Sequence, residues 1–186
     1  MYGRRYLRMH VKKSKQIAIA GLLAAVAAVL MILSSVVETS SIFFIAGASY
    51  MVGIVIREWG NRAGLGFWIA STIVNFIVAP NKFYCVTYLD MGLYILLSEI
   101  LWEKIAESGY LTYRMSLLWL GKFAIFNLMF VPTVLFLQEL IFLRFLETWQ
   151  MLLVTLIGQV ALVVYDNGYR YFQGAIWGRI RIKLMR

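Results

Sequence analysis

Two charged side chains lie close together in an otherwise apolar part of the chain. Lys82 ends a Pro-Asn-Lys turn and Asp90 follows in the stretch APNKFYCVTYLDMGLY. An ionisable group inside an apolar run is costly unless it is paired or hydrated, so Asp90 is a candidate for binding chemistry. Two interpretations are open. Asp90 lines a hydrated pocket, or it makes a structural hydrogen bond with Lys82 or Asn75 that fixes a helical hairpin.

Other polar and aromatic side chains fall at depths compatible with the same pocket. We expect ligand binding by Asn75, Lys82, Tyr84, Tyr88, Asp90, Asn127 and Gln159. Aromatic rings for stacking and one carboxylate would suit a ring-containing metabolite that is neutral or cationic. For Asn127 and Gln159 the alternative is a hydrogen bond between helices, since amides inside a membrane bundle face other helices.

A second charged pair stands nearer the other end of the same helices. Glu99 lies near the end of one apolar run and Lys122 near the start of the next. If these runs are adjacent antiparallel helices, the two side chains form an ion pair, which we expect to be structural. A relay for transport is the alternative.

The residues needed for most enzyme mechanisms are missing from the sequence. The chain has one histidine, His10, in its basic start, and one cysteine, Cys85. No phosphate-binding glycine-rich loop or HExxH motif is present. Asp90 and Asp166 are expected on opposite faces, which disfavours an aspartyl pair. The sequence therefore predicts a non-enzyme with no catalytic residues, metal site or cofactor.

The composition is that of a membrane protein. Of 186 residues, 62% are apolar, and the mean hydropathy is +0.77. Soluble domains hold about 45–50% apolar residues, so a water-soluble fold of this length is excluded. The net charge of +9 sits in the tails and short loops. It is therefore explained by membrane topology, and no nucleic-acid partner is expected.

Six apolar runs are long enough, or nearly so, to cross a bilayer as helices. They cover residues 17–37, 42–56, 63–79, 83–102, 115–137 and 148–165. The sequence therefore predicts an all-α fold, a polytopic bundle of six transmembrane helices. Such a bundle uses the whole chain, residues 1–186, as a single integral membrane domain.

The distribution of basic residues predicts the orientation of the bundle. With six spans, the tails and the second and fourth loops hold 15 of the 18 lysines and arginines. Basic loops stay in the cytoplasm, so both termini should be cytoplasmic in a multi-pass protein of the bacterial plasma membrane. The bundle would cover residues 17–167, between basic cytoplasmic tails at 1–16 and 168–186. The second tail is either an amphipathic helix on anionic lipid or a basic extension of the sixth helix.

The first apolar run carries small residues at every fourth position. Ala20, Ala24 and Ala28 would form a smooth ridge along one helix face. Small residues at this spacing let another helix approach closely, so the ridge is a candidate interface with a membrane partner. Packing inside the same bundle is the alternative.

The six runs and the opening KSKQIAIAGLLAAVAAVL resemble the S component of energy-coupling-factor vitamin transporters. The chain also resembles uncharacterised S-component-like membrane proteins of Gram-positive bacteria. Those carry a turn similar to Pro80-Asn81-Lys82 and a Gly-x-Tyr that corresponds to Gly92 and Tyr94. Ile95 stands where they often have proline.

The resemblance implies a function for the bundle. Such a subunit captures a small, vitamin-like metabolite from outside and topples in the membrane against a transmembrane coupling subunit driven by two ATPase subunits. The ridge at Ala20, Ala24 and Ala28 would face that coupling subunit. The alternative function is a non-transporting membrane scaffold similar to the rod-shape family of cell elongation, which binds partners and no metabolite.

Overall fold

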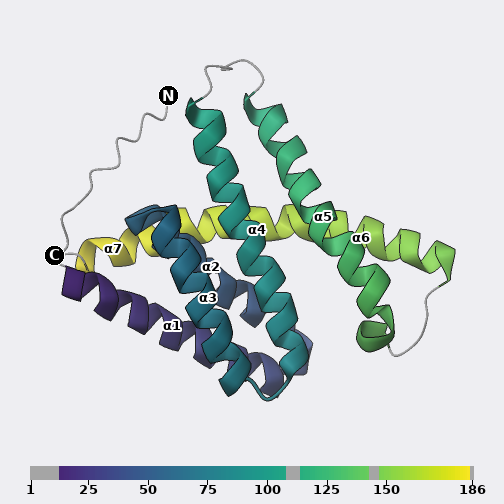
Figure 1. Cartoon of the computed structure of the whole chain (residues 1–186), viewed down its shortest axis with the longest axis horizontal. Helices are drawn as coiled ribbons and strands as arrows, with labels where there is room; N and C mark the ends of the chain where they lie inside the picture. The colour runs from purple at the N-terminus through teal and green to yellow at the C-terminus, as the bar shows by residue number, and fades with distance from the viewer. Residues whose placement is uncertain (1–12, 108–113, 143–146, 185–186) are drawn as a thin grey trace.

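The described part of the protein is built from helices alone. The computed structural model describes residues 13–107, 114–142 and 147–184 (Figure 1). Its long helices are α1 (Lys13–Val36), α2 (Ser41–Trp59), α3 (Asn61–Val78), α4 (Lys82–Glu107), α5 (Arg114–Phe142) and α6 (Thr148–Tyr171). A 3-10 turn at Glu38–Ser40 precedes α2. A π-helical segment, Phe172–Trp177, joins α6 to α7 (Gly178–Leu184). The all-α prediction is confirmed for these residues.

Five of these helices are long and apolar enough to cross a membrane. The candidate spans are Ser14–Val36, Ser41–Trp59, Lys82–Glu107, Met115–Leu135 and Trp149–Arg181. Large apolar side chains face outward on them; Phe43 and Leu128, for example, are each 77% exposed. These features are those of a multi-pass membrane protein. The third predicted run forms α3, which is as regular as the others but is not one of the five.

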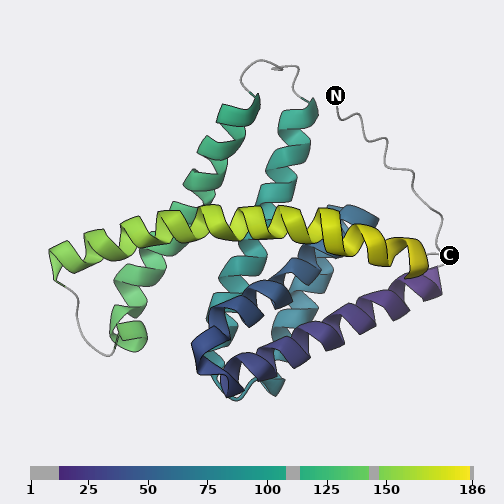
Figure 2. The same ribbon diagram turned by 180° about the vertical axis from the view of Figure 1, so that it is seen from behind.

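The first four helices form a packed group around α2, which contacts α1, α3 and α4. Helix α5 packs along α4. The rod made by α6, the π-helical segment and α7 crosses α4 and α5, as Figures 1 and 2 show from opposite sides. The rod ends beside the start of α1. Because α6 crosses its neighbours instead of running along them, it brings its own polar residues to several helices at once.

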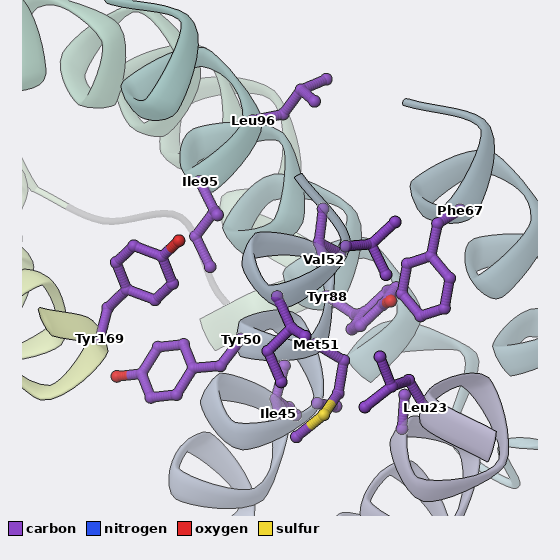
Figure 3. Close-up of a cluster of buried hydrophobic side chains, with 14 of the residues drawn as sticks. Leu23, Ile45, Tyr50, Met51, Val52, Phe67, Tyr88, Ile95, Leu96 and Tyr169 are labelled. Carbon is purple, nitrogen blue, oxygen red and sulfur yellow. The ribbon is translucent and has the colours of Figure 1, made fainter. Parts of the chain in front are cut away.

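The buried core lies where α2 meets α1, α3 and α4. Figure 3 shows Leu23, Ile45, Val52 and Tyr88 packed together there. Glycine allows the helices to come this close. A Cβ atom at Gly53 would stand 2.1 Å from the Tyr169 hydroxyl oxygen. Any larger residue at this position would therefore push α2 and α6 apart or displace the tyrosine.

Local sequence signals end the helices at the two tight turns, between α2 and α3 and between α3 and α4. Gly60 separates α2 from α3 with φ 91°, a left-handed conformation that favours glycine. Pro80 stands between α3 and α4, where Asn81 Oδ1 accepts a hydrogen bond from the Phe83 amide at 3.0 Å. The Lys82 ammonium donates to the carbonyl of Ala79 at 3.0 Å. Lys82 thus caps the end of α3, where a positive charge suits the helix dipole.

The second basic tail continues the sixth helix. Of the two interpretations of the residues from Gly168 onward, the structure agrees with an extension of the sixth helix, because helical structure runs without a break from Thr148 to Leu184. Glu58 at the end of α2 fixes this extension, because its Oε1 accepts from Trp177 Nε1 at 3.0 Å and lies 3.1 Å from Arg181 Nε. Of the other tail, residues 1–12 lie outside the described part.

Candidate functional site

One polar cluster lies near the tip of the hairpin made by α3 and α4. Ser71 on α3 and Tyr88 on α4 share a hydrogen bond of 2.7 Å in the interior. Ser41 at the start of α2 donates to the Tyr84 hydroxyl at 3.2 Å. These contacts show that α2, α3 and α4 all supply polar groups to the same end of the core. Tyr84 and Tyr88, both predicted to bind a ligand, belong to this cluster.

Asn75 is the unusual member of this cluster. Its side chain is 0% exposed, and neither the amide oxygen nor the amide nitrogen has a hydrogen-bond partner. The backbone carbonyl of Asn75, in contrast, accepts a hydrogen bond from Cys85 Sγ at 3.4 Å. A buried polar group without a partner costs about 1–3 kcal/mol. The α3–α4 cluster therefore holds one free donor and one free acceptor inside the protein.

Asp90 and Lys82 do not meet each other or Asn75. The Asp90 carboxylate accepts a hydrogen bond from the Thr133 hydroxyl on α5 at 3.3 Å. Lys82 is occupied with the end of α3, where its ammonium also lies 5.2 Å from the centre of the Phe76 ring. Both structural hydrogen bonds considered for Asp90 are therefore absent from the structure. Asp90 lies half-buried between α4 and α5, away from Asn75.

Asn127 on α5 and Gln159 on α6 bind each other. Their side-chain amides exchange hydrogen bonds of 3.2 Å and 2.9 Å. This reciprocal pair is the contact between helices that was the alternative to ligand binding. The seven predicted ligand residues therefore divide into three groups, at the α3–α4 hairpin, between α4 and α5, and between α5 and α6.

The alanine ridge of α1 faces partly inward. Ala20 and Ala24 are partly buried against the core of the same chain, and Ala28 is also partly buried. The neighbouring Ala27 is fully buried. Only part of the ridge surface is thus available to another helix.

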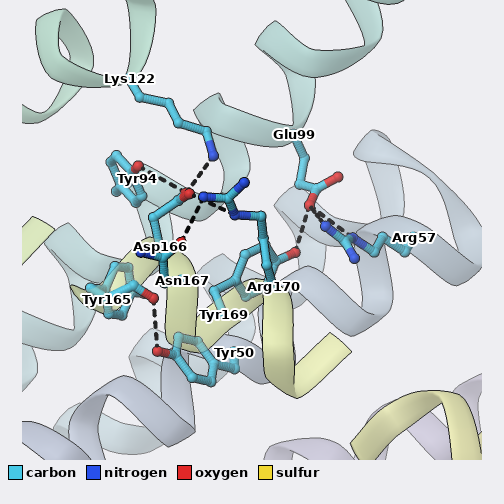
Figure 4. Close-up of polar contacts among 10 residues, drawn as sticks. All are labelled: Tyr50, Arg57, Tyr94, Glu99, Lys122, Tyr165, Asp166, Asn167, Tyr169 and Arg170. Carbon is cyan, nitrogen blue, oxygen red and sulfur yellow. Dashed lines mark hydrogen bonds and ion pairs between the residues drawn. The ribbon is translucent and has the colours of Figure 1, made fainter. Parts of the chain in front are cut away.

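A network of charged residues lies where α6 crosses α4 and α5 (Figure 4). The Asp166 carboxylate is 1% exposed and forms an ion pair with Lys122 of α5. It also accepts from the Tyr94 hydroxyl at 3.3 Å and lies 3.2 Å from Arg170 Nε. The expected ion pair between Glu99 and Lys122 is wrong, because the crossing of α6 places Asp166 beside Lys122.

Glu99 is paired with a different helix. Its Oε1 accepts two hydrogen bonds from the Arg57 guanidinium, at 2.8 Å and 2.5 Å, and one from the Tyr169 hydroxyl at 2.7 Å. The Arg57 guanidinium also lies 4.9 Å from the centre of the Tyr169 ring. Since Arg57 belongs to α2 and Tyr169 to α6, this cluster joins three helices.

Sequence reasoning missed Asp166 and Tyr169 as members of this network, although a signal was available. Tyr165, Asp166, Tyr169 and Arg170 repeat at spacings of three and four residues, which places them along one side of a helix. A polar stripe of this kind points into a protein interior. The predicted bundle ended at residue 167, so Tyr169 and Arg170 were assigned to the tail and the stripe was divided between the two.

Comparisons with known proteins do not identify the class of this protein. No family model matches the chain, and no curated protein or solved structure is similar to it. Within the described residues, no group of three histidine, cysteine, aspartate or glutamate side chains is placed to hold a metal ion. The described residues form a helical protein with five helices that are long and apolar enough to cross a bilayer. Its interior holds a hairpin cluster and a charged network.

Proposed function

We propose that the chain is a membrane-embedded capture subunit for a small metabolite, similar to the S components of energy-coupling-factor transporters. In this proposal α3 crosses the membrane as a sixth span, both termini are cytoplasmic, and the α3–α4 turn faces outward. The ligand binds near that turn. A transmembrane coupling subunit with two ATPases then drives its release inside the cell.

The observation that supports this proposal is the unpaired amide of Asn75. An unsatisfied buried amide lowers stability, and a single substitution to leucine would remove this cost. Its presence at position 75 is therefore explained better by binding than by stability. An amide presents a donor and an acceptor side by side, which suits a ligand with the complementary pair. The side chains of Ser71, Tyr88 and Cys85 in the same cluster are uncharged. Because Asp90 faces α5 instead, the cluster favours a neutral ligand over a cationic one.

Entry of a ligand requires the hairpin to open. Asn75 is closed from solvent, and the turn residues Pro80 and Asn81 just beyond it are exposed. Lys82 holds the end of α3 through contacts with backbone carbonyls that are exposed or only partly buried, and such contacts break more easily than buried ones. The tip of the hairpin is therefore the segment that we expect to move.

A thermal-shift screen of neutral ring-containing metabolites on the purified chain tests this function. We expect a compound that raises the unfolding midpoint of the wild type but not of Asn75→Leu. Ligand-free Asn75→Leu should itself be more stable than the wild type, by about 1–3 kcal/mol. Thr72→Val is the matched control on the same helix, because the Thr72 hydroxyl bonds only its own helix, at the Trp68 carbonyl, 2.7 Å away.

Two results would count against capture of a metabolite. One is a wild type that no compound stabilises. The other is a compound that stabilises Asn75→Leu equally, which would mean that the amide holds only water.

The second candidate function is a non-transporting scaffold similar to the rod-shape membrane proteins. The observation in its favour is that Asp90, Asn127 and Gln159 already bind partners within the chain. A scaffold would co-purify with other membrane or cell-shape proteins in a stable complex and carry no metabolite. Mass spectrometry of the natively purified protein separates the two functions.

A further inference from the structure

Among the described residues, the charged network has one more positive than negative group. Glu99 is balanced by Arg57, whereas Asp166 alone faces two cations, Lys122 and Arg170. An uncompensated positive charge among apolar helices is unfavourable unless an anion or water reaches it. The balance of charge therefore points to an anionic group as a partner for this end of the network.

Arg170 presents this charge to the outside of the helix group. Its side chain is 44% exposed, whereas that of Asp166 behind it is 1% exposed. Asn167 Oδ1 accepts from Arg170 Nη2 at 2.8 Å. The Trp119 ring lies 5.3 Å from the guanidinium and 5.6 Å from the Lys122 ammonium. These contacts hold the guanidinium in one orientation with part of its surface free.

Apolar side chains are exposed on both helices that meet at Arg170, α5 and α6. On α5, Leu120 is 69% exposed, and on α6, Val160 and Val164 are 66% and 67% exposed. Figure 2 shows α5 diverging from the rod on either side of their crossing. Acyl chains cover such faces in a bilayer. A cation at the junction of two lipid-facing helices is therefore reachable by a lipid headgroup.

We propose that Arg170 binds the phosphate of an anionic phospholipid whose acyl chains lie against α5 and α6, and that Lys122, buried beside Asp166, adds its positive charge to the site. The planar guanidinium matches two phosphate oxygens, and the ammonium adds a second charge. Basic pockets between membrane helices bind anionic headgroups on the cytoplasmic side, which is where the proposed topology puts this site. The apolar flanks favour a lipid over free phosphate. The proposal does not depend on metabolite capture.

Thermal unfolding of the purified full chain in detergent tests the site. At about tenfold excess over its dissociation constant, phosphatidylglycerol should raise the midpoint by about 3–6 °C. Phosphatidylcholine with the same acyl chains should raise it much less. Arg170→Gln should lose the difference between the two lipids, whereas Arg62→Gln should keep it. Arg62 is an exposed arginine at the start of α3, so this control removes the same charge elsewhere.

Three results would overturn the site. They are equal shifts with both lipids, a lipid difference that survives in Arg170→Gln, and an equal shift with inorganic phosphate alone, which would indicate a free-anion site. If Arg170→Gln does not fold, Arg170→Lys replaces it. Lysine keeps the charge beside Asp166 but lacks the guanidinium fork, so the lipid difference should fall by at least half. An unchanged difference in that variant contradicts the proposal.

Discussion

Asp166 is the residue on which the charged network depends. Its buried carboxylate contacts Lys122, Tyr94 and Arg170, which come from α5, α4 and its own helix. Taking charges out of water is expensive, and the attraction between partners offsets this cost only while both are present. Removing the carboxylate should therefore cost more than removing the exposed Arg170.

The first residue-scale prediction concerns Asp166→Asn. Asparagine keeps the shape and can still accept from Tyr94, but it removes the carboxylate that pairs with the ammonium of Lys122, a residue that is only 8% exposed. We expect a loss of about 3–5 kcal/mol in unfolding free energy, measured by denaturant titration in detergent. The double variant Asp166→Leu, Lys122→Met removes both buried charges and should recover much of the loss. Asp166→Asn as stable as the wild type would show that the pair is loose and hydrated.

At the scale of residues, the sequence did not predict which charged side chains pair with each other. It pointed correctly to Asp90, Asn75 and Glu99 as polar groups within apolar runs. It paired Glu99 with Lys122 because their runs are consecutive. In the structure Glu99 forms its ion pair with Arg57 instead, because α2 packs directly against α4. To decide which of two cations pairs with Glu99, one must know which helices pack against each other. The depth of a residue along its helix does not give this information.

At the scale of elements, close helix approach explains the glycine at position 53. The second prediction is that Gly53→Ala moves the Tyr169 ring, because the added Cβ would stand 2.1 Å from its hydroxyl oxygen. The hydrogen bond from Tyr169 to Glu99 should be lost. Overpacking and this loss together should lower stability by about 1–3 kcal/mol, measured by thermal unfolding.

At Gly66 an added Cβ meets nothing within 4 Å, so Gly66→Ala is the control and should not destabilise the protein. A neutral Gly53→Ala would mean that α2 and α6 are not held this closely.

Glu58 should hold the C-terminal extension onto α2. The third prediction is that Glu58→Gln speeds hydrogen exchange across 172–184, because the contacts of Glu58 with Trp177 and Arg181 weaken together. Exchange in α2 itself should change little. Glu103→Gln is the control, since Glu103 accepts a hydrogen bond from Asn61 at the start of α3. Equal exchange in 172–184 for both variants would show that the extension is held by apolar packing alone.

The sequence predicted which segments form helices, but it left the length of the last helix open. Six apolar runs predicted six helices, and each run lies within a helix of the structure except for a few end residues. The sixth run was ended at 165 because charged and glycine residues follow it. Those residues stay helical because Asp166, Tyr169 and Gln173 are buried against other helices. Tertiary contacts stabilise helix there that composition alone disfavours.

For the molecule as a whole, α3 decides the topology. It has 18 residues, and at about 1.5 Å per residue this length gives roughly 27 Å, just enough for a thin bilayer. If α3 crosses, its two ends lie on opposite sides and the chain has six spans. If it does not cross, both ends lie on one side. The position of Arg62 relative to Asn81 therefore tests the number of spans and the orientation together.

The fourth prediction uses single cysteines in a Cys85→Ala background and a membrane-impermeant maleimide on intact cells. Asn81→Cys, at the exposed α3–α4 turn, should be labelled. Arg62→Cys and Lys104→Cys, at the far ends of α3 and α4, should be labelled only after permeabilisation, because basic ends remain in the cytoplasm. Labelling of Arg62→Cys together with Asn81→Cys would mean that α3 does not cross. Labelling of both Arg62→Cys and Lys104→Cys but not of Asn81→Cys in intact cells would mean that the protein has the inverted orientation. The α3–α4 cluster would then lie on the cytoplasmic side, where capture from outside is impossible.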